Sequence, residues 1–510
     1  MNGGTVRRVA PVLLALGLLS VHGDEKTVGD ECAGRRLREI IEGEVAALRA
    51  DLPKFIVKLG QPYPARQVLV HQKLRLTSGR GDCFSAPWRL KVDINVKKGP
   101  YRKEHRVILE IPATYPAEKP AVRFASSIAH TYLTELEEAH SRVPTHILAR
   151  TLQDAKSLRD LLGILYDMLQ GPLAAAGGDS VWQSRATAFS EETEVVKKYR
   201  KKRRHKKLFT VAGFDTLEFV DARIREAIAN LTGMSDAAAA RQLLTESGVI
   251  AEVIPGMAYS FPVFTEAFCK TIMEEVQRFY KTGLPARRPN SMNNYGIILN
   301  EIGLEPLMFA LQDALIQPLA AALFPKEGSE LESHHAFTVR YKGGEDTHLD
   351  VHTDDSDVTF NVNIFGDYEG CPLVFCGMVG APDHRHFRAA YQHRLGYAVM
   401  HSGRLRHGAE DITGGERMNL IVWSYSYNFR RSAMSKKKHR RESGMPDVRC
   451  LSYTHDRDYG RFKQFPPGKK EQFYGRGWCP QKGKEYEGFI PDVASPGAHG
   501  GPRSRRYKEL

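Results

Sequence analysis

Three residues in the C-terminal half of the chain have the types and spacing of a metal site. His352 and Asp354 open a run that reads HTDDSDVTFNVNI and ends at Ile364. Side chains of an extended segment alternate between its two faces, so the His352 imidazole and the Asp354 carboxylate point to the same side. A second histidine, His407, lies far along the chain and can complete a three-ligand face. Two histidines and one carboxylate around open coordination positions are the donor set of a non-haem Fe(II) centre.

Arg417 predicts a second ligand site close to the metal. It follows His407 by ten residues. Its guanidinium has the fork geometry that grips a carboxylate through two hydrogen bonds. We interpret this arginine as the partner of the far carboxylate of a 2-oxoglutarate co-substrate. Together with the triad it predicts a reaction class, and the catalytic set is then His352, Asp354, His407 and Arg417.

A second His-x-Asp pair, His348 and Asp350, lies four residues upstream of the first. We favour His352 and Asp354 as the metal ligands because the alternating strand follows them directly. His348 is then expected to be a surface residue or one that supports a ligand.

Length and composition describe a soluble protein of more than one domain. A chain of 510 residues is long enough for two or three domains. A hydrophobic content of 42% and a charged content of 26% are ordinary for a soluble globular protein.

The net charge of +13 comes from two basic runs and does not describe the whole surface. Lys197–Lys207 holds nine Lys and Arg residues and Arg430–Arg441 holds seven, with no acidic residue in either run. Without these sixteen cations the net charge of +13 becomes −3. Such runs are usually solvated linkers, with a targeting or anion-binding role as the alternative.

Cysteine usage excludes two common kinds of site. The seven cysteines form no Cys-x-x-Cys pair, so neither a zinc ribbon nor a thioredoxin-like site is expected. Cys371 and Cys376 are near enough in sequence to pair with each other. We favour the alternative, two buried thiols.

Both ends of the chain resemble targeting signals. Arg7 and Arg8 precede an apolar run from Val9 to Leu19, the order of a secretory signal peptide over residues 1–23. This run is too short to predict a transmembrane span, although a signal-anchor or a mitochondrial leader is the competing interpretation. The final Tyr-Lys-Glu-Leu partly matches a Lys-Asp-Glu-Leu retention signal. We expect the protein to be located in the secretory pathway, in the lumen of the endoplasmic reticulum. The nucleus is the alternative if the basic runs are localisation signals.

Residues 34–173 are predicted to form a separate α+β module. Apolar residues alternate over 90–96 and 107–111, as in two antiparallel strands, and helical patterns flank them. The following Tyr115-Pro116-Ala117-Glu118-Lys119-Pro120 resembles the Tyr-Pro-x-x-x-Pro segment of RWD and ubiquitin-conjugating-enzyme folds. A conjugating enzyme needs a cysteine soon afterwards, and none occurs between Cys83 and Cys269. The resemblance therefore implies a catalytically silent module that docks a protein partner.

The rest of the chain divides into four regions. Residues 174–212 become Ala/Gly-rich, then polar, then basic, and are expected to be a basic linker. Residues 213–332 have helical patterns, with Thr265 as a candidate N-cap, and are expected to support the site. Residues 333–427 alternate as β-strands and hold the site. Residues 428–510 are polar, basic and Gly/Pro-rich, and are expected to be largely irregular.

The stretch 257–427 resembles the Fe(II)- and 2-oxoglutarate-dependent oxygenases of the prolyl 4-hydroxylase and lysyl hydroxylase type. It resembles most the branch described as 2-oxoglutarate and iron-dependent oxygenase domain-containing proteins. Three ordered motifs carry the resemblance, and Arg288–Gly296 is similar to the same branch. The motifs are His-x-Asp-x-x-x-Val-Thr-x-Asn from His352 to Asn361, Gly-Arg-Leu-x-His-Gly from Gly403 to Gly408, and Gly-Glu-Arg-x-Asn-Leu-x-x-Trp from Gly415 to Trp423.

The resemblance implies a fold, cofactors and a reaction. The oxygenase domain would be a double-stranded β-helix, or jelly-roll, so that the whole chain is of the α+β class. Fe(II), 2-oxoglutarate, O2 and ascorbate would be the cofactors and co-substrates. Tyr341 and Asn361 would join Arg417 around 2-oxoglutarate, although a packed strand tyrosine is the other interpretation of Tyr341. The reaction would hydroxylate a prolyl or lysyl side chain of a protein and release succinate and CO2.

Two other functions compete with this one. A non-catalytic RWD-like adaptor with a degenerate oxygenase domain is disfavoured because the metal ligands and Arg417 are intact. The second alternative is a nucleic-acid demethylase, and the basic runs are the observation that would support it. Only Tyr199 places an aromatic ring within them, so nucleic acid is not the expected partner.

Overall fold

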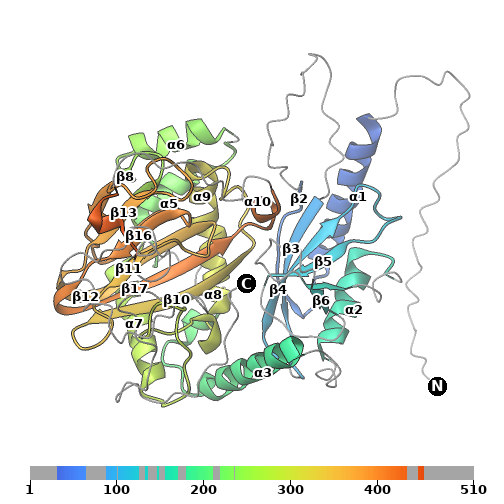
Figure 1. The fold of residues 1–510 in the computed structure, drawn as a ribbon. Helices are drawn as coiled ribbons and strands as arrows, with labels where there is room; N and C mark the ends of the chain where they lie inside the picture. The colour runs from blue at the N-terminus through green and yellow to red at the C-terminus, as the bar shows by residue number, and fades with distance from the viewer. Residues whose placement is uncertain are drawn as a thin grey trace, which may run out of the picture.

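The computed structural model describes 31–64, 88–99, 101–125, 133–135, 146–148, 155–170, 180–210, 219–234, 236–432 and 446–452. The signal peptide predicted over residues 1–23 and the retention signal predicted at the last four residues lie outside these ranges. Figure 1 shows two bodies, an N-terminal one and a larger C-terminal one, with helix α3 running beneath both.

The N-terminal body is an antiparallel sheet with helices on one face. The sheet has the order β1-β3-β4-β5, with β2 paired to β3, and β6 and β7 form a separate pair. Helices α1 and α2 supply apolar side chains to the same core as the sheet. The bounds are α1 Glu31–Ala50, β1 Ile56–Leu59, β2 Tyr63–Pro64, β3 Trp88–Asn95, β4 Glu104–Ile111, β5 Ala121–Phe124, β6 Leu133–Glu135, β7 His146–Leu148 and α2 Leu158–Gln170. The two strands predicted from alternation are confirmed. The RWD-type identity of this body stays a prediction.

The region expected to be a linker is largely helical. Helix α3 spans Ser180–Arg200, and the short helix η1, Lys206–Phe209, follows it. Tyr199, Leu208 and Phe209 are buried in the core of the C-terminal body. The segment is therefore an ordered connection. Most of its lysines and arginines are exposed, whereas these three apolar side chains pack it against the domain.

The C-terminal body contains two antiparallel sheets. The larger sheet has the order β10-β17-β12-β15-β9-β8, and the smaller one has the order β11-β16-β13-β14. The bounds are β8 Ala251–Ile254, β9 Ala258–Pro262, β10 Ser333–Lys342, β11 Leu349–His352, β12 Val358–Gly370, β13 Leu373–Met378, β14 Ala389–Tyr391, β15 Tyr397–Ser402, β16 Leu405–Ala409 and β17 Ile412–Tyr425. Strands β8 and β9 come from the region expected to be helical, so the β domain begins earlier than predicted.

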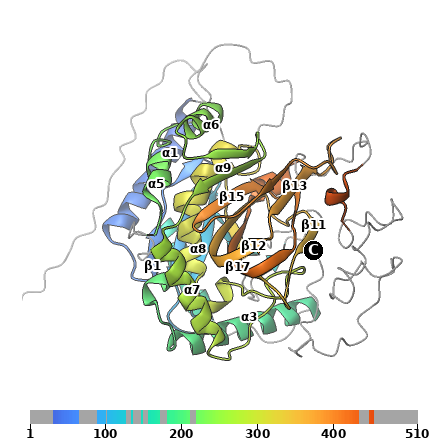
Figure 2. The ribbon, with the colours of Figure 1, turned by 90° about the vertical axis from the view of Figure 1, so that its left-hand side faces the viewer.

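Helices cover the outer face of the larger sheet (Figure 2). Phe268 and Ile272 of α7 share one core with Phe360 and Val362 of β12. The Thr265 hydroxyl accepts a hydrogen bond from the Phe268 N–H at 3.2 Å, so the predicted N-cap of α7 is confirmed. The remaining bounds are α5 Ala222–Ala229, α6 Ala237–Glu246, α7 Glu266–Tyr280, η2 Asn300–Ile302, α8 Glu305–Leu311, η3 Gln312–Ile316, α9 Gln317–Leu323, α10 Tyr427–Arg431 and η5 Val448–Cys450.

One helical stretch among the described residues, Glu305–Leu323, is long and apolar enough to cross a membrane. Most of it is buried inside the protein. Apolar residues from this stretch, including Leu307 and Leu319, belong to the core beneath the larger sheet. Its apolar composition is therefore accounted for by packing within the domain.

A buried ionic network joins the two bodies. On the sheet face opposite α1 and α2, Arg89 contacts Glu330 at 2.6 Å and Glu332 at 2.9 Å. Arg123 contacts Glu332 at 2.8 Å, and its guanidinium lies 4.2 Å from the ring centre of Tyr427. The exposed fraction of each of these four charged side chains is at most 7%. The polar face of the N-terminal sheet is therefore occupied by the chain's own C-terminal body.

Glu332 is the acid on which this network depends, and we expect its neutralisation to be costly. Burial alone would raise the pKa of Glu332, but Arg123 and Arg89 lower it below its usual range. Glu332→Gln should lower the free energy of unfolding by about 3–5 kcal/mol at neutral pH, because two buried arginines lose a partner. Since the folded-state pKa is lowered, this contribution is lost as the pH falls through it, and the difference from the wild type should shrink in acid.

Urea unfolding measures this effect. Glu118→Gln removes an exposed carboxylate of the same module and should change the free energy by less than about 0.5 kcal/mol. Equal losses in the two variants would contradict a central role for Glu332.

Candidate active site

The structure brings His352, Asp354 and His407 together. One ligand atom from each lies within 4.8 Å of the others, and all three residues are nearly inaccessible to solvent. His352 ends β11 and pairs directly with His407 on β16, so the ladder sets the two imidazoles side by side. Asp354 follows β11 and places its Oδ1 atom 3.2 Å from His352 Nε2 and 3.5 Å from His407 Nε2. The three side chains therefore converge on one point.

Hydrogen bonds fix which nitrogen of each histidine faces that point. Nδ1 of His352 lies 2.8 Å from the Asp350 carbonyl oxygen, and Nδ1 of His407 lies 2.9 Å from the Leu405 carbonyl oxygen. A carbonyl can only accept, so both Nδ1 atoms carry the proton and both Nε2 lone pairs point toward Asp354. These are imidazoles oriented as metal ligands.

The Asp354 carboxylate is also held in place. The Thr359 hydroxyl donates to Asp354 Oδ2 at 2.5 Å, and its own oxygen lies 2.7 Å from the Ser356 hydroxyl. The Asp354 N–H donates to the Gly403 carbonyl at 3.0 Å. Asp354 Oδ2 therefore already accepts a hydrogen bond from the protein, whereas Oδ1 faces the two histidines. Asp354 can thus offer one oxygen, Oδ1, to a metal ion.

Electrostatics give His407 and Asp354 the protonation states that a metal needs. Burial lowers the pKa of His407 to about 3, so its imidazole is neutral at physiological pH. Burial alone would raise the pKa of Asp354, but His407 and His352 lower it below its usual range. Two neutral imidazoles and one ionised carboxylate are the donor set that suits Fe(II). The residues present therefore fit the metal that the sequence implies.

Arg417 is a buried cation without an acidic partner. Its exposed fraction is 1%, and no carboxylate lies within 4.0 Å of it among the described residues. One amino group donates to the Cys371 carbonyl, while Nε has no hydrogen-bond partner in the protein. A buried charge without compensation is strongly unfavourable. The arrangement therefore favours an anion that comes from outside the chain.

One polar surface connects Arg417 with the triad. Thr359, which bonds Asp354, is two residues from Asn361 on β12, so the two side chains share a face. Asn361 accepts a hydrogen bond from Asn419 on β17 at 2.7 Å, and Arg417 lies two residues along that strand. The intervening Phe360 and Met418 belong to the core that the helices share with the opposite face of the sheet. Arg417 and the triad therefore lie on the inner side of the larger sheet.

The two further residues predicted to bind the co-substrate lie on this surface. Tyr341 pairs with Arg417 across β10 and β17, and the guanidinium lies 4.7 Å from its ring centre. The Tyr341 hydroxyl lies 3.4 Å from Nδ2 of Asn293 and is buried. Asn361 is held by Asn419, as described above. The structure thus places both beside residues of the site, and their contact with a ligand stays a prediction.

Sequence reasoning missed three polar residues of this surface. Asn293 contacts Tyr341, and Asn419 lies 3.2 Å from Nε2 of His393. Both asparagines lay within stretches recognised as motifs, and the position of Asn419 on β17, two residues after Arg417, could have identified it. Asn293 lies in an irregular segment, so strand alternation gave no signal for it. His393 had no signal, because it precedes β15 in an irregular segment with no periodicity.

The upstream His348 is outside the cluster. Its Nδ1 atom lies 3.0 Å from Asp411 Oδ1, and the residue is only 5% exposed. The expectation that it is not a ligand agrees with this position, whereas a location on the surface was wrong.

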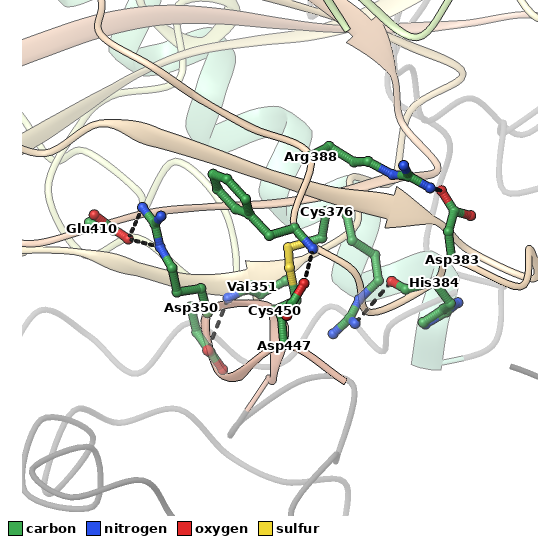
Figure 3. Close-up of a disulfide and its surroundings, with 12 residues drawn as sticks. Asp350, Val351, Cys376, Asp383, His384, Arg388, Glu410, Asp447 and Cys450 are labelled. Carbon is green, nitrogen blue, oxygen red and sulfur yellow. Dashed lines mark hydrogen bonds and ion pairs between the residues drawn. A yellow bond between two sulfur atoms is a disulfide. The ribbon is translucent and has the colours of Figure 1, made fainter. Parts of the chain in front are cut away.

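The C-terminal tail is attached to the strands that carry the ligands. Cys376 on β13 and Cys450 in the tail form a disulfide with Cα atoms 5.8 Å apart (Figure 3). The Ser452 hydroxyl donates to Asp350 at 3.1 Å, and the Asp350 carbonyl orients His352. The possible Cys371–Cys376 pair is therefore wrong. The favoured expectation of two buried thiols is confirmed for Cys371 and wrong for Cys376, which is disulfide-bonded. Residues 446–452 of this tail are mostly irregular, with the short helix η5 at Val448–Cys450, and the disulfide holds them against the domain.

Comparisons with known proteins agree with this geometry. A family model described as an OGFOD2-like domain matches residues 195–329. Human 2-oxoglutarate and iron-dependent oxygenase domain-containing protein 2 is 42% identical over 167 residues, 32% of this chain and 48% of the relative. The Arabidopsis thaliana oxygenase domain-containing protein ICU11 is 37% identical over 189 residues, 35% of this chain and 47% of the relative. The chain thus spans about half the length of these curated relatives.

Two other known proteins are similar to this chain at lower sequence identity. Human procollagen-lysine,2-oxoglutarate 5-dioxygenase 1 is 30% identical over 177 residues, 33% of this chain and 23% of the relative. A solved prolyl-4-hydroxylase from Pseudomonas putida is 14% identical, with a TM-score of 0.25 over 41% of this chain and 98% of that one.

The C-terminal region of this chain is similar to 2-oxoglutarate and iron-dependent oxygenase domain-containing protein 2. It also holds a His-Asp-His cluster of the kind that could bind a metal ion.

The geometry predicts which histidines hold a metal. His407→Ala removes a ligand and should weaken Co(II) binding at least about tenfold, as measured by calorimetry with Co(II) as an air-stable probe. His348→Ala is the matched control, because it removes a buried histidine that lies outside the triad. Undiminished Co(II) binding in His407→Ala would contradict the assignment.

Proposed function

We propose that this protein is an Fe(II)- and 2-oxoglutarate-dependent dioxygenase that hydroxylates a C–H bond. One observation carries the proposal: the His-Asp-His cluster, whose histidines lie on the smaller sheet, and a buried, uncompensated arginine on the larger sheet border the same polar surface. A metal site alone would fit many proteins. The added cation specifies a second ligand that bears a carboxylate.

Each residue of the site has a separate role in the proposed reaction. Bound Fe(II) would supply the O2-dependent oxidation that converts 2-oxoglutarate to succinate and CO2 and hydroxylates the substrate. His352 and His407 present oriented Nε2 lone pairs, and Asp354 presents one free oxygen. Arg417 holds the far carboxylate of 2-oxoglutarate, with Tyr341 beside it. Burial of all five side chains keeps bulk water away, which strengthens each electrostatic contact.

The finer fold assignment belongs to this proposal. The larger and smaller sheets are the two halves of a double-stranded β-helix. The connectivity supports this assignment, because the chain passes from β11 in the smaller sheet to β12 in the larger one, then to β13 in the smaller one. The ligands His352 and Asp354 lie at one such crossing.

The substrate class that we propose is a prolyl or lysyl side chain of a protein, with ascorbate keeping the iron reduced. Support comes from the similarity to a protein whose name is procollagen-lysine 5-dioxygenase. A peptide library with candidate lysines and prolines, read by a mass increase of one oxygen, would identify it. Hydroxylation confined to nucleic acid or small molecules would contradict the proposed class.

Succinate formation from 2-oxoglutarate tests the function directly. The purified protein with Fe(II) and ascorbate should form succinate, and His352→Ala should reduce it to background. Arg417→Ala should raise the 2-oxoglutarate KM roughly tenfold to hundredfold, since a charge-assisted pair is lost. His348→Ala should retain most turnover. Absence of succinate in the wild type, together with no Co(II) binding, would favour the non-catalytic adaptor instead.

We also propose that the protein works in the oxidising lumen of the secretory pathway. The buried Cys376–Cys450 disulfide supports this, because such bonds persist in oxidising compartments. Alkylation of thiols in intact cells, followed by mass spectrometry, should find these two cysteines linked by a disulfide. Cys269 and Cys371 should be recovered as free thiols. Recovery of Cys376 and Cys450 as alkylated thiols before any reduction would contradict this location.

A further inference from the structure

The basic segment after α3 is a fixed part of the fold. The N–H groups of Arg204 and His205 donate to Oε2 of Glu275 on α7 at 3.0 and 2.7 Å. The Tyr199 hydroxyl also bonds this carboxylate, and Glu275 is fully buried. The buried Leu208 and Phe209 hold the far end of the segment. Its four consecutive cations, Lys201 to Arg204, are therefore set in a defined place.

A cleft of about 390 Å³ lies between this segment and the end of α7. Figures 1 and 2 show the end of α3 beside α7. Residues 274, 277, 278 and 281 line the second wall, and this i, i+3, i+4, i+7 spacing makes one helical face. The Arg278 Nε donates to the Lys202 carbonyl at 3.0 Å and ties the two walls together. The cleft is lined by Lys201, Lys202, Arg203, Arg204, Glu274, Gln277, Arg278 and Lys281.

The charge of this cleft is strongly unbalanced. Its lining holds six cations and one carboxylate, Glu274, which already pairs with Arg204 at 3.1 Å. The other five cations have no carboxylate within 4.0 Å among the described residues. Burial and the nearby Arg200 lower the pKa of Arg203 to about 10, although the buried Glu275 carboxylate acts in the opposite direction. Such repulsion opposes folding, and an anionic ligand would relieve it.

The form of the cleft limits the kind of anion. Its volume falls in the range of small-molecule sites, which is too small for an extended duplex. The lining has no aromatic ring, so bases would find no surface on which to stack. Arginine forks and lysine point charges together suit phosphate oxygens. The cleft is also separate from the proposed active site, because α7 packs on the outer face of the larger sheet while the triad lies on the inner side.

We propose that this cleft binds a compact ligand with several phosphate groups, such as an inositol polyphosphate, free or as the headgroup of a lipid. The shared chemistry is a cluster of phosphates on a small ring. This site goes beyond the proposed oxygenase function and does not depend on it.

Inositol hexakisphosphate serves as the probe, with binding to the full chain measured by calorimetry. Lys201→Glu/Lys281→Glu reverses one charge on each wall and should weaken binding at least about tenfold. Lys97→Glu/Lys98→Glu changes the net charge equally on exposed lysines of the N-terminal module and should leave binding within about twofold. Succinate formation without the probe should be the same in all three proteins.

Two further arms identify the source of the phosphates. Vesicles with a phosphatidylinositol bisphosphate, compared with phosphatidylcholine vesicles, would show lipid binding, whereas binding of the soluble probe alone would indicate a free ligand; either result supports the proposal. No binding by the wild type at low salt, or equal weakening in both double variants, would overturn it. A clear preference for a single-stranded oligonucleotide over the probe at equal salt would overturn it in favour of nucleic acid.

Discussion

The alternation of side chains along β12 and β17 is the constraint on which the rest of this structure depends. On one face, Phe360, Val362 and Leu420 pack under the helices and form the main core. On the other face, Thr359, Asn361 and Arg417 form the polar surface that supports the site. Because the period is two, a slip of one residue would exchange the faces and put Arg417 into the core. Stability and site geometry are therefore set by the same strand register.

Burial has opposite consequences at two places in the molecule. Between the two bodies, Arg89 and Arg123 are matched by Glu330 and Glu332, so charge taken from water is compensated within the chain. At Arg417 the described part of the chain offers a carbonyl oxygen and aromatic faces but no carboxylate within ion-pair distance. The first arrangement joins two parts of one chain, whereas the second leaves a demand for an external anion. The two places differ in whether the chain supplies a carboxylate to pair with the arginine, since the arginines at both places are buried.

The buried ionic network between the two bodies also changes how the surface of the N-terminal module is interpreted. Its sheet has a face of charged residues, which in an isolated module would suggest a docking surface. In the whole chain that face contacts Glu330 and Glu332, and α10 adds Tyr427 beside Arg123. The module is thus firmly connected to the domain that carries the site.

The sequence by itself determined the chemistry and much of the local structure. Ligand types, their spacing and strand alternation depend on neighbours within a few residues, so His352, Asp354, His407 and Arg417 could be identified without coordinates. The tertiary structure alone decided what depends on distant contacts. It paired Cys376 with Cys450, which are 74 residues apart, and added β8 and β9 to the larger sheet. It also fixed the basic segment through Glu275, because the partner that orders those cations lies on another helix.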